Sequence, residues 1–586
     1  MPAHLLLFAV VLAAEPVSAG TGSGPAVLSE IGLPPGTELA AIAWAGSATS
    51  AGLWLAANLD SPVSGVAVVG MAEQSPRCRI GAAVRLGWSG SGGSATAPTL
   101  ETVTGETIQF APGLFEATTV AVGDGCLYLA GYGSPALEPL VASCGGVLAR
   151  HPHAALPATT GDGAVARTDD RDSRADGLHL RRIGAPVVLR FDLGGPGPRL
   201  VAATFLEGWQ QVWEHRRPEP QPTESAWQPT QVVVLPDGDL AVGHDGGYSL
   251  ADDLRTALTE VPEAQRGRVN EYHVCDHISR ISSDLRQRRW RHDLYAPRVD
   301  QAVAAQIKDG WPFDHFGNPR LLGLTGTADG GLLASGWAAS ATSQEPMWVP
   351  FLRRLDGAGV QRWTTYELDP MSGPENRLGG LVSDSAVFSA VEDGAGRILA
   401  TTAGDGGNSI LRRDPRDWTK PAPALRGSVS NFKGRILFWG ATVVLDRDGG
   451  LLAGDHLVGR GVRRPGYGPT WGLAMADRGG GANVLLGRYL EGMRVEKAEQ
   501  PAVDAAPGAF LRGQRLVADN SVPGAVWRLA SEWTLALPGL RPVAMALRED
   551  FAVVAGGRHI DARERGILAV IRLPPARLVP PQGTTD

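Results

Sequence analysis

Residues 322–368 read LGLTGTADGGLLASGWAASATSQEPMWVPFLRRLDGAGVQRWTTYEL, and this stretch decides the fold. It contains an apolar segment, an Asp-Gly turn, a second apolar segment ending in a small residue, a polar loop and a third apolar segment. A second glycine turn and a segment with Trp363 complete it. Asp-Gly and Gly-Gly accept the positive φ of tight hairpin turns at little cost. Four antiparallel strands in a unit of this length predict one blade of a β-propeller.

The same order of segments recurs along the chain. Clear copies of all or part of the unit occupy residues 119–131, 230–243 followed by 277–290, 387–418, 442–454 and 543–573, with an N-terminal unit at 39–86 and a weaker one at 162–193. The strands after the turns are continuous apolar runs, which suit strands covered on both faces by neighbouring blades. The sequence therefore predicts an all-β chain: a single β-propeller of seven or eight four-stranded blades, with short helical insertions around 251–310. We expect the N- and C-terminal strands to pair and close the ring, because closure removes exposed edges.

A tryptophan follows the third strand of several units. Trp290, Trp363, Trp418 and Trp533 occupy this position, and the interval from Trp418 to Trp533 is about twice the preceding one. An aromatic residue that recurs once per blade typically fills the space between adjacent sheets. We therefore predict inter-blade packing, rather than ligand contact, for all four. The long interval predicts a blade without a tryptophan that contains the turn at Asp448.

The repeat pattern resembles that of a known group of proteins. VPFLRRLDGAGVQRWTTYEL after DGGLLASGW resembles the repeats of secreted bacterial propellers, which combine DGG-φ-φ-φ-x-G, a loop and φ-x-K-φ-D-x-x-G-x-φ-x-W. The match is close at 322–368 and partial at 230–290, 387–418 and 442–476. This resemblance implies an extracytoplasmic propeller but no shared activity or catalytic residues. LDGAGVQRW is also similar to the Trp-docking repeat of quinoprotein dehydrogenases and outer-membrane assembly propellers, but it occurs well only once.

The N-terminus reads MPAHLLLFAVVLAAEPVSAG. Its apolar run, Leu5 to Ala14, is too short to span a bilayer as a helix and precedes a small-x-small cleavage pattern at Val17-Ser18-Ala19. The positive charge before it is limited to the amine and His4. We predict a signal peptide at 1–19, the propeller at 25–578 with insertions at about 251–276 and 296–320, and a flexible tail at 579–586. The alternative for the N-terminus is a buried strand. The mature chain is expected to be secreted or periplasmic, without a transmembrane segment.

Charge and cysteine content restrict the partners and the redox compartment. The net charge of −7 comes with no basic block, so nucleic acid and anionic membranes are excluded as predicted partners. The four cysteines are Cys78, Cys126, Cys144 and Cys275. In an oxidising compartment an even number permits disulfides. Cys126 and Cys144 lie in two segments that resemble strands, and we predict a bridge between them. A Cys78–Cys275 bridge follows only by elimination.

The first candidate site lies in the insertion at 296–320. Trp311, Phe313, Asp314, His315 and Phe316 form an aromatic cluster around one carboxylate. Long insertions on a propeller project from one rim, and exposed aromatic side chains there would form a recognition surface. The alternative is that this segment folds back and caps its own blade.

The second candidate site is His273-Val274-Cys275-Asp276-His277. On a strand, His273, Cys275 and His277 share one face and could bind zinc or copper. These positions match Met347, Val349 and Phe351 of the best repeat, so the alternative is blade core. Calcium could bind at Asp169, Asp170 and Asp172, or at Asp446 and Asp448, although a turn role explains the second group. No other cofactor is predicted.

Catalytic signatures are missing from the sequence. It contains no G-x-S-x-G elbow, no H-E-x-x-H motif and no sialidase-type S-x-D-x-G-x-x-W turn. The preferred hypothesis is a binding or scaffold module for a protein, glycan or small molecule. One alternative is an extracytoplasmic enzyme acting on a carbohydrate or small molecule, which predicts carboxylates and arginines converging at one mouth of the central channel. Another is a cell-envelope or surface assembly component.

Overall fold

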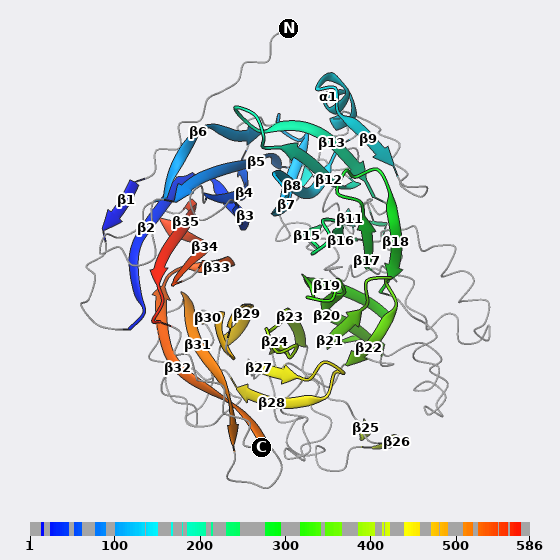
Figure 1. Cartoon of the computed structure of the whole chain (residues 1–586), viewed down its shortest axis with the longest axis vertical. Coiled ribbons are helices and arrows are strands. Elements are labelled where there is room, and N and C mark those ends of the chain that lie inside the picture. Colours follow the sequence, from blue (N-terminus) through cyan, green and yellow to red (C-terminus); the bar gives the residue numbers. More distant parts are fainter. Residues whose placement is uncertain are drawn as a thin grey trace, which may run out of the picture.

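The computed structural model shows a β-propeller of seven four-stranded blades arranged around a central axis (Figure 1). It describes residues 13–16, 24–45, 52–60, 77–88, 100–134, 136–150, 166–167, 178–179, 185–206, 213–214, 230–245, 276–294, 317–341, 346–365, 385–404, 413–414, 417–421, 439–456, 470–479, 481–489, 508–519, 526–548, 550–560 and 563–575. Seven blades agree with the lower of the two predicted numbers.

Each blade is an antiparallel sheet. Blade 1 contains β3 (Thr37–Ala45), β4 (Gly52–Asp60), β5 (Arg77–Trp88) and β6 (Leu100–Gln109). Blade 2 contains β7 (Phe115–Gly123), β8 (Cys126–Gly133), β12 (Ala185–Asp192) and β13 (Arg199–Phe205). Blade 3 contains β15 (Gln231–Val234), β16 (Leu240–Asp245), β17 (Asp276–Ile281) and β18 (Arg288–Asp293). Blade 4 contains β19 (Gly317–Gly326), β20 (Leu332–Ala341), β21 (Pro346–Leu355) and β22 (Gln361–Thr365).

The remaining blades complete the ring. Blade 5 contains β23 (Ser385–Glu392), β24 (Ile398–Gly404), β27 (Trp439–Leu445) and β28 (Leu451–His456). Blade 6 contains β29 (Thr470–Gly479), β30 (Ala482–Tyr489), β31 (Gly508–Asp519) and β32 (Val526–Pro538). Blade 7 contains β33 (Arg541–Arg548), β34 (Phe551–Ile560) and β35 (Arg563–Arg572), with β2 (Ala26–Pro35) as its outer strand. The predicted ring closure is confirmed, because N-terminal β2 pairs with C-terminal β35, for example Ile31 with Leu568.

Short additional strands lie outside the four-stranded pattern. β1 (Ala13–Pro16) pairs with the outer edge of β2, β9 (Val147–Arg150) lies parallel to β13, and β10 (Ala166–Arg167) pairs with β5. β11 (Leu178–His179) pairs with β14 (Trp213–Glu214), and β25 (Arg413–Asp414) pairs with β26 (Asp417–Pro421). β1 falls within the predicted signal peptide. Blade 7 keeps its four strands without it.

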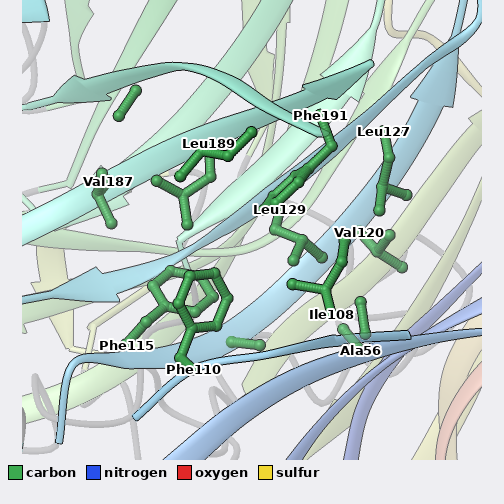
Figure 2. Packing of buried hydrophobic residues seen from close by; sticks show 14 of the residues in the cluster. Ala56, Ile108, Phe110, Phe115, Val120, Leu127, Leu129, Val187, Leu189 and Phe191 are labelled. Carbon is green, nitrogen blue, oxygen red and sulfur yellow. The ribbon is translucent and has the colours of Figure 1, made fainter. Parts of the chain in front are cut away.

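The hydrophobic core is divided among the seven contacts between adjacent blades, and each contact has its own cluster of buried residues. In β34, Ala552 and Val554 face blade 6, whereas Val553 and Ala555 face blade 1. This double burial explains why the predicted strands are continuous apolar runs. Figure 2 shows the contact between blades 1 and 2, where Ala56 and Ile108 of blade 1 meet Val120 and Leu189 of blade 2.

A β-bulge recurs in the innermost strands. In six of the seven blades the pairing of the first strand with the second shifts by one residue near its start, for example between Ala117 and Thr119 of β7. The inner strand then lies so close to the second strand that a side chain at the adjacent position of the second strand would collide with the backbone of the inner strand. A Cβ on Gly131 would lie 1.9 Å from the carbonyl oxygen of Glu116, and one on Gly556 would lie 2.3 Å from that of Arg541. This explains the small residue that closes the second strand of the repeat.

The two ends of the blades differ. Antiparallel order places the first-to-second and third-to-fourth strand connections at one end, which we call the turn end. These connections are mostly tight turns, such as 124–125 and 356–360. The second-to-third connections and those between blades leave from the opposite end, which we call the insertion end. They include 246–275, 295–316 and 405–438. Long connections are therefore concentrated at the insertion end.

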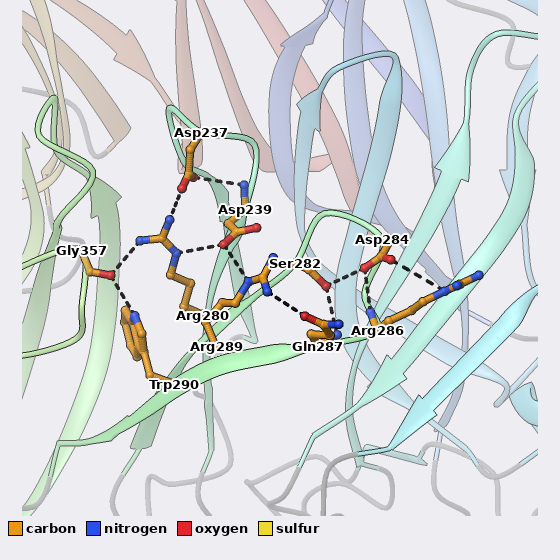
Figure 3. A network of polar contacts seen from close by, with 10 residues as sticks. All are labelled: Asp237, Asp239, Arg280, Ser282, Asp284, Arg286, Gln287, Arg289, Trp290 and Gly357. Carbon is orange, nitrogen blue, oxygen red and sulfur yellow. Dashed lines mark hydrogen bonds and ion pairs between the residues drawn. The ribbon is translucent and has the colours of Figure 1, made fainter.

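Trp290 joins the turn ends of blades 3 and 4 (Figure 3). It lies on β18 and donates from Nε1 to the carbonyl oxygen of Gly357 at 3.0 Å. Arg280 donates to the same oxygen at 2.8 Å, and it also binds Asp239 at 3.1 Å and Asp237. Because Gly357 belongs to the next blade, these bonds cross the contact between the two sheets.

Trp363 repeats this arrangement one blade further on. Its Nε1 donates to the carbonyl oxygen of Arg447 in blade 5 at 2.9 Å. Trp533 packs in the cluster between blades 6 and 7. The inter-blade prediction is therefore confirmed for Trp290, Trp363 and Trp533.

The predicted place of Trp418, after the third strand of a blade, is wrong. Trp418 lies in β26, which pairs only with β25 and belongs to no blade. The connection 405–438 separates the second and third strands of blade 5. The outer half of that blade therefore consists of β27 and β28. The Asp448 turn joins these two strands, and no additional blade exists there. Asp446 caps this turn through bonds from the backbone of Asp448 and Gly450 at 2.9 and 2.7 Å, which is the predicted turn role.

The predicted Cys126–Cys144 disulfide is absent, and both residues are free thiols. Cys126 is buried at the start of β8, where it accepts a hydrogen bond from Arg190 at 3.3 Å. Cys144 is exposed after α1 (Leu137–Ser143), a helix where the sequence analysis expected a strand. Leu137 and Val141 are both buried, and their spacing of one helical turn accounts for the difference. Cys275 lies outside the described residues.

Three further predictions concern organisation. The weak unit at 162–193 is not a blade: its β12 is the third strand of blade 2. The insertion predicted at 296–320 ends earlier, because β19 begins at Gly317. Within the region predicted to hold helical insertions, around 251–310, residues 276–281 and 288–293 are the strands β17 and β18. Residues 251–275 and 295–310 lie outside the described residues, as do Asp169, Asp170 and Asp172. In the described part of the chain, no helix is long and apolar enough to cross a membrane.

Candidate functional site

The two connections that contain the residues predicted from the sequence begin and end at the insertion end of blades 3 and 4. The predicted ligand-binding residues lie in the connection between β18 and β19, outside the described residues: Trp311, Phe313, Asp314, His315 and Phe316. Of the predicted metal ligands, His273 and Cys275 also lie outside them, in the connection between β16 and β17. His277 is described and is the second residue of β17.

His277 forms a buried pair with His244. The two residues are direct neighbours across β16 and β17, and their ring centroids lie 5.5 Å apart. His277 has no exposed surface and His244 is 1% exposed. The Nε2 atom of His244 lies 3.3 Å from the hydroxyl of Ser279, which is also buried. Two imidazoles and a hydroxyl therefore share one face of the sheet, between blade 3 and blade 2.

The histidine pair is a departure from the repeat. Counted from the first residue pair of the second and third strands, His244 and His277 correspond to Gly336 and Phe351 of blade 4. The sequence alternative for His277, a position equivalent to Phe351 in the blade interior, is confirmed. Among the described residues, no group of three or more His, Cys, Asp and Glu side chains could hold a metal ion. The metal site at His273, Cys275 and His277 stays a prediction.

A second set of polar contacts fastens the start of β17 and the end of β18 to blade 4. The Asp276 carboxylate accepts a hydrogen bond from the backbone of Leu321 at 2.7 Å. The buried Arg353 guanidinium donates to the carbonyl oxygen of Leu294 at 2.9 Å and to Nε2 of His292 at 3.1 Å. Because a guanidinium only donates, the Nε2 atom of His292 accepts this hydrogen bond.

These contacts hold the ends of two connections in one place. The connection 246–275 leaves β16 directly after Asp245 and returns at Asp276, whereas 295–316 begins after Leu294 and returns in β19 before Leu321. We call the contacts of Asp276, Leu294, Leu321 and Arg353 the insertion frame. A ligand-binding segment needs fixed ends, because mobile ends would have to be ordered when the ligand binds. The frame supplies such ends for both predicted sites.

Sequence reasoning missed most of this frame. Arg353 was part of the best repeat, and His292 lies just beyond Trp290, but neither carries a motif. His244 had a usable signal, because it follows Leu240-Ala241-Val242-Gly243 at the position where blade 4 has Gly336. Pairing it with His277 required the register of β16 and β17.

Charged residues also gather at the insertion end of the inner strands. Glu38, Glu116 and Arg541 each lie two residues before the bulged residue of their strand, in blades 1, 2 and 7. Glu116 is 2% exposed, and Glu38 and Arg541 are partly exposed. Beyond the bulges, the described inner strands carry charge only near the turn end, at Glu392, Asp477, Arg478 and Arg548. The middle of each described inner strand therefore carries no charged residue.

Comparison with known proteins identifies no family. No protein-family model and no curated protein matches the chain. Solved structures are similar at low identity. The Trypanosoma rangeli sialidase in complex with sialic acid is 8% identical with a TM-score of 0.31, and the match covers 96% of this chain and 57% of that sialidase. This chain thus spans little more than half of that protein.

Two other solved structures belong to different groups. The parainfluenza virus 5 hemagglutinin-neuraminidase ectodomain is 9% identical with a TM-score of 0.27, over 95% of this chain and 84% of that one. A GH43 β-xylosidase/α-arabinofuranosidase from a compost microbial metagenome is 11% identical with a TM-score of 0.26, over 73% and 97%. Such similarities carry no information about the activity of this chain.

Proposed function

We propose that this protein is an exported, secreted or periplasmic binding propeller that holds a glycan or small molecule at the insertion end of blades 3 and 4. The observation that carries this proposal is the insertion frame. It fixes the ends of 246–275 and 295–316 side by side through Asp276, Arg353 and the backbone that they bind. The second connection contains the aromatic and polar side chains predicted to contact a ligand, a combination that suits sugar rings and aromatic molecules.

The test is a binding screen of the purified mature chain against glycan and small-molecule arrays. A first variant replaces residues 298–314 by a short Gly-Ser linker, and a control variant replaces residues 408–412 in the connection of blade 5 in the same way. We expect the first variant to lose its array hits and the control to keep them. Hits that persist in the first variant, or a wild-type chain without hits, would overturn the proposal.

A second pair of variants tests the frame itself. Asp276→Ala leaves the backbone N–H of Leu321 without its buried acceptor, so the two connections should lose their fixed ends. We expect at least tenfold weaker binding of any hit by Asp276→Ala, measured by calorimetry. The control is Asp192→Asn, because Asp192 is an exposed carboxylate at the turn end. This variant should bind as wild type does. Equal affinity in both variants would show that the frame does not support the site.

The second candidate function is hydrolysis of a glycosidic bond at the insertion end of the inner strands, and Glu38 and Glu116 favour it. A pair of carboxylates can supply the acid and the base or nucleophile of this reaction. Both residues occupy one register position on neighbouring inner strands, and Arg541 has the same position in blade 7. Incubation with the oligosaccharides found by the array screen tests it. Product formed by wild type but lost in Glu38→Gln would establish this second function in place of simple binding.

A further inference from the structure

A histidine side chain meets a buried arginine at the insertion frame. His292 lies on β18 opposite Ile278, whose side chain packs between blades 3 and 4, so His292 also faces blade 4. Its Nε2 atom lies 3.1 Å from Nη1 of Arg353 on β21. Arg353 is 1% exposed, whereas His292 is partly exposed. A proton from the solvent can therefore reach the histidine, while the arginine stays buried.

The Nη1 group of Arg353 uses both of its hydrogens here. One is donated to His292 and the other to the carbonyl oxygen of Leu294 at 2.9 Å, while Nε donates to the hydroxyl of Thr364 at 2.9 Å. A guanidinium has five N–H donors in a fixed arrangement and no acceptor. If His292 stopped accepting, a buried N–H of Arg353 would lose its acceptor, which is unfavourable.

Protonation of His292 removes this acceptor. An imidazolium has an N–H on both ring nitrogens and only donates, as a guanidinium does. Two cations would then face each other at hydrogen-bond distance and repel, in a place where little water screens their charges. A histidine in a peptide takes up its proton at about pH 6.5, so this change belongs to mildly acidic conditions.

Other charged groups near His292 do not replace the lost bond. Among the described strands that pack around it, Asp276 and Arg280 of β17 also reach blade 4. The Asp276 carboxylate favours the charged histidine but is bound to a backbone N–H of blade 4, and Arg280 is bound to two aspartates at the turn end. His277 lies on the other face of β17. The direct contact with Arg353 is therefore the one that protonation changes.

We infer that protonation of His292 loosens the insertion frame, so that the frame is intact at neutral pH and weakened in mild acid. The effect reaches both connections through Leu294. Its N–H donates to the carbonyl oxygen of Asp276 at 3.1 Å, and the Asp276 carboxylate holds the N–H of Leu321 at 2.7 Å. Loss of Arg353 from Leu294 therefore affects the ends of both connections together. Weaker ligand binding in acid follows, and that part rests on the proposed function.

The experiment measures amide hydrogen exchange of the full chain at pH 7.5 and pH 5.5, corrected for the intrinsic exchange rates. Peptides that contain Leu294 and Leu321 report the frame, and a peptide from β34 of blade 7 reports the rest of the ring. In wild type we expect the protection of the frame peptides to fall at least about fivefold at pH 5.5, the lower end of typical coupling between sites. The β34 peptide should keep its protection.

Two variants assign the effect to one side chain. In His292→Gln the carbonyl oxygen of the glutamine accepts from Arg353 and does not titrate, so the frame peptides should have the same protection at both pH values. His292→Asn serves if circular dichroism shows that the first variant does not fold. His559→Gln, on β34, is the matched control and should keep the wild-type response to pH.

Equal protection of the wild-type frame at both pH values overturns the inference, and so does a fall that persists in His292→Gln. A fall that includes the β34 peptide would show general unfolding in acid and would likewise refute it. Hydrogen exchange needs no ligand, so this result is separate from the array screen. If the frame responds to pH but the screen has no hits, the proposed function fails and the inference stands.

The array screen repeated at the two pH values tests the consequence for binding. Any hit should bind to wild type at least about fivefold more weakly at pH 5.5 than at pH 7.5. The same hit should bind equally to His292→Gln at both values. Equal wild-type affinity at both pH values would overturn the regulation of binding by His292.

Discussion

Asp329 lies at the turn end of blade 4 and connects two blades. Its side chain makes three contacts, one with a threonine and two with arginines. Its carboxylate accepts from Thr327 at 2.6 Å, from Arg354 at 2.9 Å and from Arg447 of blade 5 at 2.8 Å. Burial acts to raise the pKa of Asp329, but the hydrogen bonds from Thr327, Arg447 and Arg354 outweigh it and hold this pKa well below its usual range. The Asp329 carboxyl group is therefore more readily ionised in the folded protein than in the unfolded chain.

We predict that Asp329→Asn lowers the free energy of unfolding by about 1 kcal/mol at pH 7, a value reduced by the 40% exposure of the side chain. Because the folded-state pKa is depressed, the carboxylate stabilises the protein above its ordinary value near 3.8, and this contribution disappears as the pH falls further. Urea denaturation of both proteins from pH 7 to pH 3 measures it. The gap should narrow below pH 4; a gap that widens there contradicts the assignment.

The histidine pair in blade 3 makes a second prediction at this scale. The double variant His244→Gly with His277→Phe restores the residues that blade 4 has at the same positions. We expect it to remain within about 1 kcal/mol of wild type, because replacing both members of a buried polar pair by fitting apolar groups is nearly neutral. His277→Ala alone should lose about 2–3 kcal/mol, since it leaves a cavity.

Denaturant unfolding of the three proteins compares these values. If the double variant were as unstable as His277→Ala, the register equivalence with Gly336 and Phe351 would be wrong. If it were stable but bound the array hits poorly, the pair would have a role at the insertion end that packing does not require.

Among structural elements, the inner strand with its bulge is the part of the blade that tolerates least change. We predict that Gly131→Ala costs at least about 2 kcal/mol, because its Cβ would lie 1.9 Å from the carbonyl oxygen of Glu116 and the backbone would have to move. Gly394→Ala is the matched control, since a Cβ there meets nothing within 4 Å. It should change stability by no more than about 0.5 kcal/mol. Equal losses in thermal midpoint would argue against the close approach of the two strands.

The elements were predictable where turn chemistry repeats. Asp329-Gly330 and Asp124-Gly125 marked hairpins that the structure contains, and Trp290 and Trp363 were correctly placed between blades. The position of Trp418 was predicted wrongly, because the spacing of tryptophans along the chain cannot show that the connection 405–438 interrupts a blade. The segment of α1 was misread because seven residues give only two buried positions, Leu137 and Val141. In the candidate site, His277 was identified from a local sequence motif. Arg353 and His244 are distant from that motif in the sequence, and only strand pairing brings them to the site.

At the scale of the whole molecule, ring closure depends on β2. We predict that a chain beginning at residue 20 keeps the thermal midpoint of the full-length protein to within a few degrees, because blade 7 retains four strands without β1. A chain beginning at residue 36 lacks β2, exposes the edge of β35 and loses buried Leu28, Ile31 and Leu33. We expect its midpoint to fall by more than 10 °C, since about 1 kcal/mol shifts the midpoint of a domain by several degrees.

Circular dichroism melts of the two truncated chains, with size-exclusion chromatography, test this prediction. Association of the second chain would agree with an exposed strand edge. A midpoint unchanged by loss of β2 would mean that closure contributes little, and a large loss in the first chain would assign β1 to the fold rather than to a leader.

Only Gly36 lies between β2 and β3, although the two strands belong to different blades. This arrangement affects the order in which the blades can form during synthesis. The first blade strand to leave the ribosome, β2, belongs to the sheet whose other three strands, β33, β34 and β35, are the last to be made. Blade 7 cannot form until β33, β34 and β35 have been synthesised, so the ring closes only after the strands of the other six blades have been made. The last hairpin, β34 and β35, therefore acts as the latch that closes the ring.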